Sequence, residues 1–147
     1  MPEPLAPNDY LPLVKAALAE DIGSGDVTTQ ALVPEDSFAT AVMVAREPLV
    51  MAGVDLALAA FEQVDERVEF GIEVLDGQQG RLGQALLRVE GPTRALLTAE
   101  RTALNFVQRL AGVATLTARF VEQVAGTGAQ ILDTRKTTPG WRALEKY

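Results

Sequence analysis

Ile131-Leu132-Asp133-Thr134-Arg135-Lys136-Thr137-Thr138-Pro139-Gly140 is the stretch that decides the fold. Residues 130–132 are predicted to form a short strand, which leads into an acid, two adjacent cations among threonines, and a Pro-Gly turn. In α/β proteins, loops that leave the carboxyl ends of strands carry the binding groups. Adjacent arginine and lysine beside hydroxyl groups suit a multiply charged anion. The stretch therefore predicts the start of a βα series with an anion site in its loop.

Two structural interpretations of this loop stay open from the residues alone. Asp133 could pair with Arg135, which would make the loop a purely structural feature. Two adjacent cations also repel each other, so they need either a bound anion or wide exposure to solvent. Trp141 is expected to be a packing residue, and Arg142 and Lys146, four residues apart on a helix, either extend the positive field or are solvated.

Upstream of this stretch, the hydrophobic pattern predicts a helix, antiparallel strands and further helices. A helix over residues 7–19, with Asn8 as a plausible N-cap, ends in a turn-forming loop over residues 20–29. The remaining predicted elements are strands over 38–46, 68–75 and 85–90, helices over 54–64 and 141–147, and a long helix from 93 to about 125 interrupted near Gly112. Glycines at 126 and 128 end the long helix.

The long helix is predicted to have one ligand-facing side. At about 100° per residue, one side carries Arg101, Asn105, Gln108 and Gly112. The opposite arc holds the apolar residues Leu104, Phe106, Val107, Leu110 and Ala111. A guanidinium, two amides and a glycine could receive a ligand, although an ordinary solvated face would show the same pattern. Glutamate and lysine form helices better than asparagine does, so a side that served solubility alone would be expected to carry them.

Composition indicates a globular protein. The 147 residues are 48% hydrophobic and 22% charged, with no cysteine and no histidine. Lack of cysteine excludes a disulfide framework and fits a reducing cytoplasm, and lack of histidine removes the commonest general base and metal ligand. Residues 1–7 show no secretory signal and no segment is long enough to cross a membrane, so a cytoplasmic protein is expected.

Charge is unevenly distributed along the chain. The formal net charge of −7 divides into −11 over residues 1–100 and +4 over residues 101–147. The acidic total argues against a general nucleic-acid binder, whereas the basic second part is expected to face something negative. A solubilising acidic surface on the first part is the alternative explanation.

The turn over residues 76–83, between two predicted strands, also suggests a lipoyl- or biotinyl-type carrier domain. A carrier needs a lysine at the hairpin tip to hold its prosthetic group, and none lies between Lys15 and Lys136. This function is therefore excluded. Nucleotide-binding glycine motifs and zinc-ligand spacings are absent from the sequence as well.

Three segments together carry a specific resemblance. Residues 20–29 read EDIGSGDVTT, residues 100–106 read ERTALNF and continue through GVAT at 112–115, and residues 132–140 read LDTRKTTPG before LEKY at 144–147. In this order they resemble the amino-terminal half of the quinolinate phosphoribosyltransferase family, over essentially the whole chain. The resemblance implies an α/β fold. An α+β sandwich domain with an antiparallel, barrel-sandwich-like sheet would cover residues 1–112, and the first βα unit of a truncated α/β barrel would cover residues 113–147.

The resemblance also implies an activity and its residues. The family transfers phosphoribose from phosphoribosyl pyrophosphate to quinolinate, with loss of carbon dioxide and pyrophosphate, to give nicotinate mononucleotide for NAD synthesis. Arg135 would contact a quinolinate carboxylate, Lys136 would contact phosphoribosyl pyrophosphate, and Thr134 lies in the same loop. Arg101 would reach into the site of a neighbouring subunit, which implies a homodimer with shared active sites. Magnesium would accompany the pyrophosphate, with its ligands outside this chain.

One departure from the family pattern affects the expected activity. The family continues beyond Tyr147 into further barrel strands, which carry an Asn-His-Arg segment, another lysine and acidic residues. The chain is therefore expected to be an inactive fragment, and its catalytic residues stay unassigned. Two alternatives remain: a molybdate-transport-associated phosphoribosyltransferase-like protein, and a non-catalytic domain that dimerises through the helix at 93–125.

Overall fold

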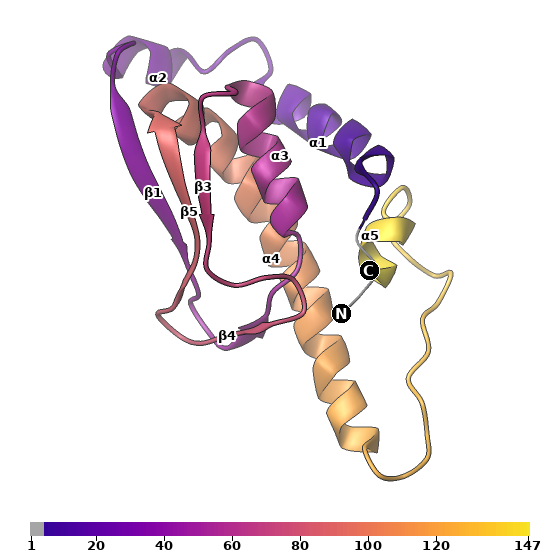
Figure 1. Cartoon of the computed structure of the whole chain (residues 1–147). Coiled ribbons are helices and arrows are strands. Elements are labelled where there is room, and N and C mark those ends of the chain that lie inside the picture. The colour runs from indigo at the N-terminus through magenta and orange to yellow at the C-terminus, as the bar shows by residue number, and fades with distance from the viewer. Residues whose placement is uncertain (1–4) are drawn as a thin grey trace.

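The computed structural model describes residues 5–147; residues 1–4, part of the segment in which no leader was expected, lie outside it. A three-stranded antiparallel sheet, in the order β1-β5-β3, forms one layer. It comprises β1 (Phe38–Val44), β3 (Glu69–Ile72) and β5 (Ala85–Pro92). Helices α3 (Val54–Val64) and α4 (Thr93–Val124) form the layer beside it, and α1 (Pro7–Ile22) packs on both of them (Figure 1). The predicted antiparallel α+β arrangement is confirmed.

The central strand β5 has the alternation of a half-buried strand. Leu87 and Val89 are buried toward the helices, whereas Arg88 and Glu90 point outward and are exposed. In register, Leu87 lies between Met43 of β1 and Ile72 of β3. Helix α3 matches its predicted range, because a long apolar run at helical spacing is the strongest signal that a sequence carries. Its Phe61 contacts Phe70 of β3, with 6.3 Å between the ring centroids.

Several sequence predictions were wrong. Helix α4 is continuous through Gly112, because a single glycine costs only about 1 kcal/mol in a helix that packing already holds. The N-cap of α1 is Ala6, not Asn8, and α1 extends to Ile22. The expected loop over residues 20–29 gives way at its end to a short helix α2 (Val27–Leu32), whose N-cap Asp26 accepts a hydrogen bond from the Thr29 N–H.

The strand predicted at residues 130–132 is absent. These residues are exposed and carry no strand hydrogen bonds, and none of the residues described pairs with them. A parallel strand forms only beside a neighbour that accepts and donates its ladder bonds. Two further strands were missed, β2 (Leu49–Val50) and β4 (Gln79–Gly80), which pair with each other over two residues each. Pairs that short leave no periodic signal.

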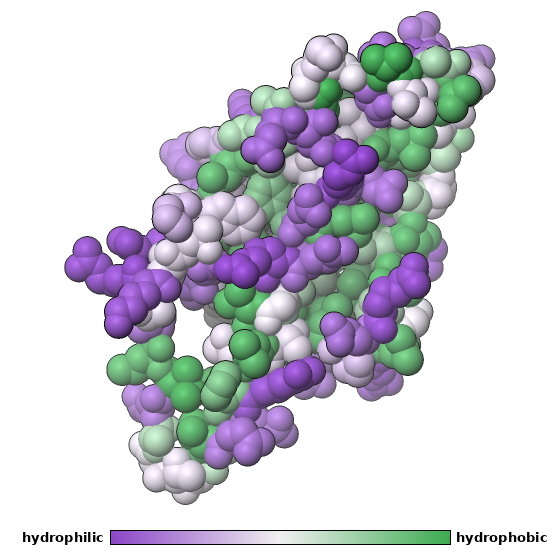
Figure 2. Space-filling view, turned by 180° about the vertical axis from the view of Figure 1, so that it is seen from behind, coloured by the Kyte–Doolittle hydropathy of each residue, from purple (hydrophilic) through white to green (hydrophobic). Residues whose placement is uncertain are grey.

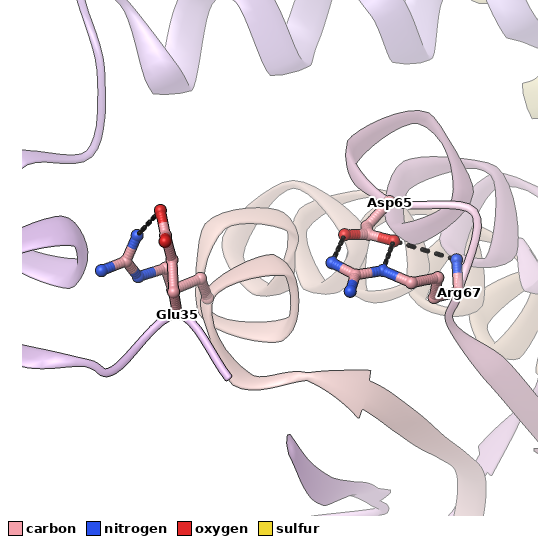
Figure 3. A network of polar contacts seen from close by, with 4 residues as sticks. Glu35, Asp65 and Arg67 are labelled. Carbon is pink, nitrogen blue, oxygen red and sulfur yellow. Dashed lines mark hydrogen bonds and ion pairs between the residues drawn. The ribbon is translucent and has the colours of Figure 1, made fainter. Parts of the chain in front are cut away.

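Charged contacts fix the turns around the sheet. After α3, the carboxylate of Asp65 accepts hydrogen bonds from the Arg67 side chain at 2.7 and 3.0 Å and from its N–H at 3.0 Å (Figure 3). These bonds to Arg67 lower the pKa of Asp65 to about 2. Glu35, labelled in the same view, pairs with Arg94 of α4, which also donates to the Val33 carbonyl. The start of α4 is thereby tied to the segment between α2 and β1.

Asp76 caps helix α3 from the turn between β3 and β4. Its carboxylate accepts hydrogen bonds from the N–H groups of Gly53 and Val54 at 3.0 and 3.1 Å, at the positive end of the helix dipole. Gly53 has φ of 98°, a left-handed conformation that side chains rarely adopt, and an added Cβ would lie 3.1 Å from Leu110 Cδ1. A carboxylate 22 residues away in sequence therefore accepts the hydrogen bonds of the free N–H groups at the start of α3.

Replacing Asp76 with alanine should destabilise the fold by about 1–2 kcal/mol, the usual cost of a lost N-cap. The substitution leaves two helix N–H groups without their acceptor. Urea denaturation of the 147-residue chain measures the change. Asp36→Ala is the matched control, since Asp36 is exposed and its carboxylate accepts no hydrogen bond within residues 5–147. Equal loss in both variants would contradict the capping role.

Candidate anion-binding site

The predicted anion loop leaves the body of the molecule and returns to it. After α4, the chain over residues 125–137 arches away and comes back to a short helix, α5 (Arg142–Lys146), which lies beside α1 (Figure 1). Arg135 and Lys136 belong to this segment and are exposed, and within residues 5–147 neither side chain forms an ion pair. Two adjacent cations with no acidic neighbour to neutralise them are available to an anion.

Thr134 orders the backbone between the cations. Its hydroxyl oxygen accepts a hydrogen bond from the Lys136 N–H at 3.1 Å, which is the local turn that Ser and Thr favour. The alternative pairing of Asp133 with Arg135 is wrong, because Asp133 instead pairs with Lys146 of α5 at 2.7 Å. Arg142 donates to the Arg135 carbonyl at 3.4 Å. Helix α5 therefore contacts the loop without using either cation.

Helix α5 rests on α4 through apolar contacts. Leu144 is 2% exposed, and Trp141 stacks on Phe106 of α4 with 5.2 Å between ring centroids. The expectation that Trp141 is a packing residue is thus confirmed. Tyr147 lies against Asp76; burial, followed by the charge of Asp76, raises the pKa of Tyr147 to about 12. The end of the chain is consequently docked on the same turn that caps α3.

A polar cluster of Arg109, Thr138 and Glu145, which no pattern in the sequence indicates, joins the loop to α4. Glu145 accepts hydrogen bonds from the Thr138 hydroxyl at 2.7 Å, from the Thr138 N–H at 3.0 Å, and from Arg109 Nη2 at 2.6 Å. Arg109 also donates to the Thr138 hydroxyl oxygen at 3.1 Å. No spacing rule could have found the pair, because Arg109 and Glu145 are 36 residues apart.

The cluster holds Glu145 ionised. Hydrogen bonds from Thr138 and then from Arg109 lower the pKa of Glu145 from 4.5 to about 2. A carboxylate with a lowered folded-state pKa contributes stability that is fully present above its unfolded value, 4.5, and is lost as the pH falls through about 2. A carboxyl-detected NMR titration should therefore place Glu145 well below its ordinary value. Titration near 4.5 would show that the cluster does not form in solution.

Arg101 lies elsewhere on the molecule. It is eight residues before Arg109, or about 12 Å along the helix, and its side chain is 73% exposed beside the junction of α1 and α2. Its guanidinium pairs with Asp21 at 2.9 Å, and the bond to Asp21 raises the pKa of Arg101. The structure therefore brings Thr134, Arg135 and Lys136 together in one loop and does not bring Arg101 to them within this chain.

The predicted two-sided character of α4 is confirmed. Arg101, Asn105, Gln108 and Gly112 are exposed, whereas Phe106, Val107, Leu110 and Ala111 are buried and Leu104 is half-buried. Gln108 and Gly112 border a groove of about 430 Å³ between α4 and the end of β1. At the groove and beyond it, α4 projects from the fold and exposes Leu116, which lines the groove, and then Phe120 and Val121. Figure 2 shows apolar side chains gathered at this lower end of the molecule.

Residues 5–147 contain neither a metal-binding cluster of side chains nor a membrane-spanning helix. Among these residues, no three His, Cys, Asp or Glu side chains are grouped so that they could bind a metal ion. Over the same range, no helix is both long and apolar enough to cross a membrane.

Two domain descriptions of one enzyme family match the chain. Residues 26–111 match the quinolinate phosphoribosyl transferase N-terminal domain, and residues 113–147 match the C-terminal domain of the same enzyme. The chain belongs to the quinolinate phosphoribosyltransferase family. The border between the two matches lies within the continuous helix α4.

Relatives and solved structures agree with this family. The chain is 50% identical over 139 residues to the nicotinate-nucleotide pyrophosphorylase (carboxylating) of Mycobacterium leprae, covering 91% of this chain and 48% of the relative. A probable enzyme of the same name from Bacillus subtilis is 41% identical over 87% of this chain and 44% of its own length. The structure of NadC from Streptococcus pyogenes superposes with a TM-score of 0.95 at 38% identity, covering 99% of this chain and 52% of that one. The chain thus spans about half the length of the quinolinate phosphoribosyltransferase relatives it matches.

Proposed function

We propose that this chain supplies one wall of a site that transfers phosphoribose from phosphoribosyl pyrophosphate to quinolinate, with loss of carbon dioxide and pyrophosphate. The observation that carries the proposal is the exposed Arg135–Lys136 pair, which lacks acidic partners within residues 5–147 and is presented by a loop fastened to α4. Family membership supports it, as do the names of the relatives, which describe a carboxylating nicotinate-nucleotide pyrophosphorylase.

The proposed chemistry requires anion binding from these residues and no nucleophilic side chain. Displacement at the ribose carbon develops positive charge on the sugar while pyrophosphate leaves, so the protein has to hold two anions in line. We propose that Arg135 contacts a carboxylate of quinolinate, because a planar guanidinium can bind a carboxylate with two parallel hydrogen bonds. Lys136, as a compact charge, contacts phosphoribosyl pyrophosphate, and Thr134 sets the turn between them.

We further propose a homodimer in which Arg101 completes the site of the partner subunit. Arg101 lies well away from the loop in its own chain, and its side chain is largely exposed. The projecting part of α4 exposes three large apolar residues, as a surface does that a second subunit covers. Sedimentation of the intact protein would measure this assembly.

We also propose a metal cofactor and a cellular location for the protein. Magnesium accompanies phosphoribosyl pyrophosphate, and no ligand for it is proposed in this chain. A cytoplasmic location is supported by the absence of cysteine from the sequence. Nucleic acid and membranes are not proposed as partners, and the acidic net charge of −7 supports the first of these two exclusions.

A chimera tests the function. Residues 5–147 replace the matching half of the Mycobacterium leprae relative, which is 50% identical, and nicotinate mononucleotide formation is measured with quinolinate and phosphoribosyl pyrophosphate. We expect turnover by the chimera, with the isolated 147-residue chain as the control. A folded chimera that binds neither substrate would refute the proposal and would favour the molybdate-associated alternative.

A further inference from the structure

The polar side of α5 contacts the anion loop at three points. Arg142, Glu145 and Lys146 are three and four residues apart, so they share one side of the helix. They contact the Arg135 carbonyl, Thr138 and Asp133, respectively. Two of these contacts lie on the amino-terminal side of Lys136 and one lies on its carboxyl side.

Glu145 forms the most enclosed of these contacts. Its side chain is 10% exposed, whereas Asp133 in the neighbouring contact is 62% exposed. Both of its carboxylate oxygens accept hydrogen bonds from Thr138, and one of them also accepts a hydrogen bond from Arg109. Exposed ion pairs contribute little to position or stability, whereas charge-assisted bonds to a carboxylate with little solvent access are stronger.

Arg109 connects Glu145 to α4, which is part of the packed core of the fold. It lies on α4 between exposed Gln108 and buried Leu110, which is 2% exposed in the hydrophobic core. The opposite side of α5 is held by Leu144 and by Trp141, which stacks on Phe106. The position of Thr138, two residues after Lys136, is therefore set by α4 and not by the loop itself.

We propose that Arg109, Thr138 and Glu145 are positioning residues, which hold Arg135 in the geometry that binds a quinolinate carboxylate and Lys136 in the geometry that binds the pyrophosphate group of phosphoribosyl pyrophosphate. The inference rests on the function proposed above. None of the three residues needs to touch the substrate. Ordering the loop before binding removes an entropic cost that the anion would otherwise have to offset.

The test uses the 147-residue chain with inorganic pyrophosphate as the probe. Glu145→Gln and Arg109→Gln keep the side-chain size and remove one charge each. We expect the backbone ¹H–¹⁵N NOE at Arg135 and Lys136 to fall toward values of a flexible chain, and the pyrophosphate dissociation constant to rise about tenfold. Because the two residues act on the same contact, the double variant should be no worse than either single one.

Controls separate positioning from general destabilisation. Glu66→Gln and Arg81→Gln make the same changes at exposed sites outside α4 and α5 that form no ion pair within residues 5–147, and both should leave the NOE and the affinity unchanged. Arg109→Lys keeps the cation and should restore most of the affinity, which a loss of packing alone would not allow. Thr138→Val removes one hydroxyl, and it tests the positioning role if Glu145→Gln or Arg109→Gln fails to fold.

Unchanged NOE values and affinities in Glu145→Gln, Arg109→Gln and Thr138→Val would overturn the positioning role. The two proposals fail separately. Lack of binding of quinolinate and phosphoribosyl pyrophosphate by the folded chimera would refute the function, whereas the NOE comparison is made on ligand-free protein and decides the positioning role without any substrate.

Discussion

Arg135→Ala in the chimera should reduce kcat/KM for nicotinate mononucleotide formation by about 10²–10³-fold, the usual loss when one electrostatic contact to reacting groups is removed. Alanine removes the guanidinium, which is paired with no acidic side chain within residues 5–147. The substitution therefore removes a contact with the ligand and does not break an ion pair within the protein. The Arg135 carbonyl still accepts from Arg142, so the loop keeps its contact with α5.

Steady-state kinetics with each substrate varied in turn distinguish the two cations. Arg135→Ala should raise KM for quinolinate, and Lys136→Ala should raise KM for phosphoribosyl pyrophosphate. Arg81→Ala is the matched control, because Arg81 is exposed and its side chain has no hydrogen bond within residues 5–147. A change of less than about threefold in Arg135→Ala would contradict the assigned role, being smaller than the loss of one charged hydrogen bond.

Leu87→Ala should destabilise the fold by about 2–5 kcal/mol, the range for a large-to-small change in a packed core. Leu87 is fully buried on the central strand, with Met43 and Ile72 opposite it on the neighbouring strands. The shortened side chain leaves a cavity between the sheet and the helices, which these neighbours can only partly fill. Urea denaturation of the 147-residue chain measures the loss.

Leu82→Ala provides the comparison for Leu87→Ala. Leu82 is 69% exposed in the turn after β4, so the same atoms are removed without a cavity. Its stability should change by less than about 0.5 kcal/mol, as for surface substitutions generally. Similar losses in both variants would mean that the helices do not pack on β5 in solution.

Elements with a long periodic pattern were predictable from sequence. Helix α3 matches its predicted range, and β5 extends its prediction by only two residues. Elements that depend on a partner were not predictable. Strands β2 and β4 are two residues long and exist because they pair with each other, and the expected strand at residues 130–132 lacks a partner within the residues described. Local propensity cannot report whether such a neighbour is present.

Some residues of the candidate site were also predictable from the sequence, and others were not. Arg135, Lys136 and Thr134 are adjacent, so their chemistry can be inferred directly from their order. The division of the chain at residue 112 and the binding roles of these residues stay predictions. Arg109, Glu145 and Asp76 could not be found this way, because each acts on groups that are distant in sequence and close only after α4, α5 and the β3–β4 turn have packed together.

The sequence by itself determined the family, the apolar faces of α3 and α4, and a loop with two adjacent cations, because each depends on the kind and spacing of residues along the chain. Only the tertiary structure decided that the loop is fastened to α4 through Glu145 and Arg109, and that Arg101 lies apart from it. The physical reason is that hydrogen bonds and ion pairs act over a few ångströms, and which groups come within that distance is settled by how the helices and the sheet pack.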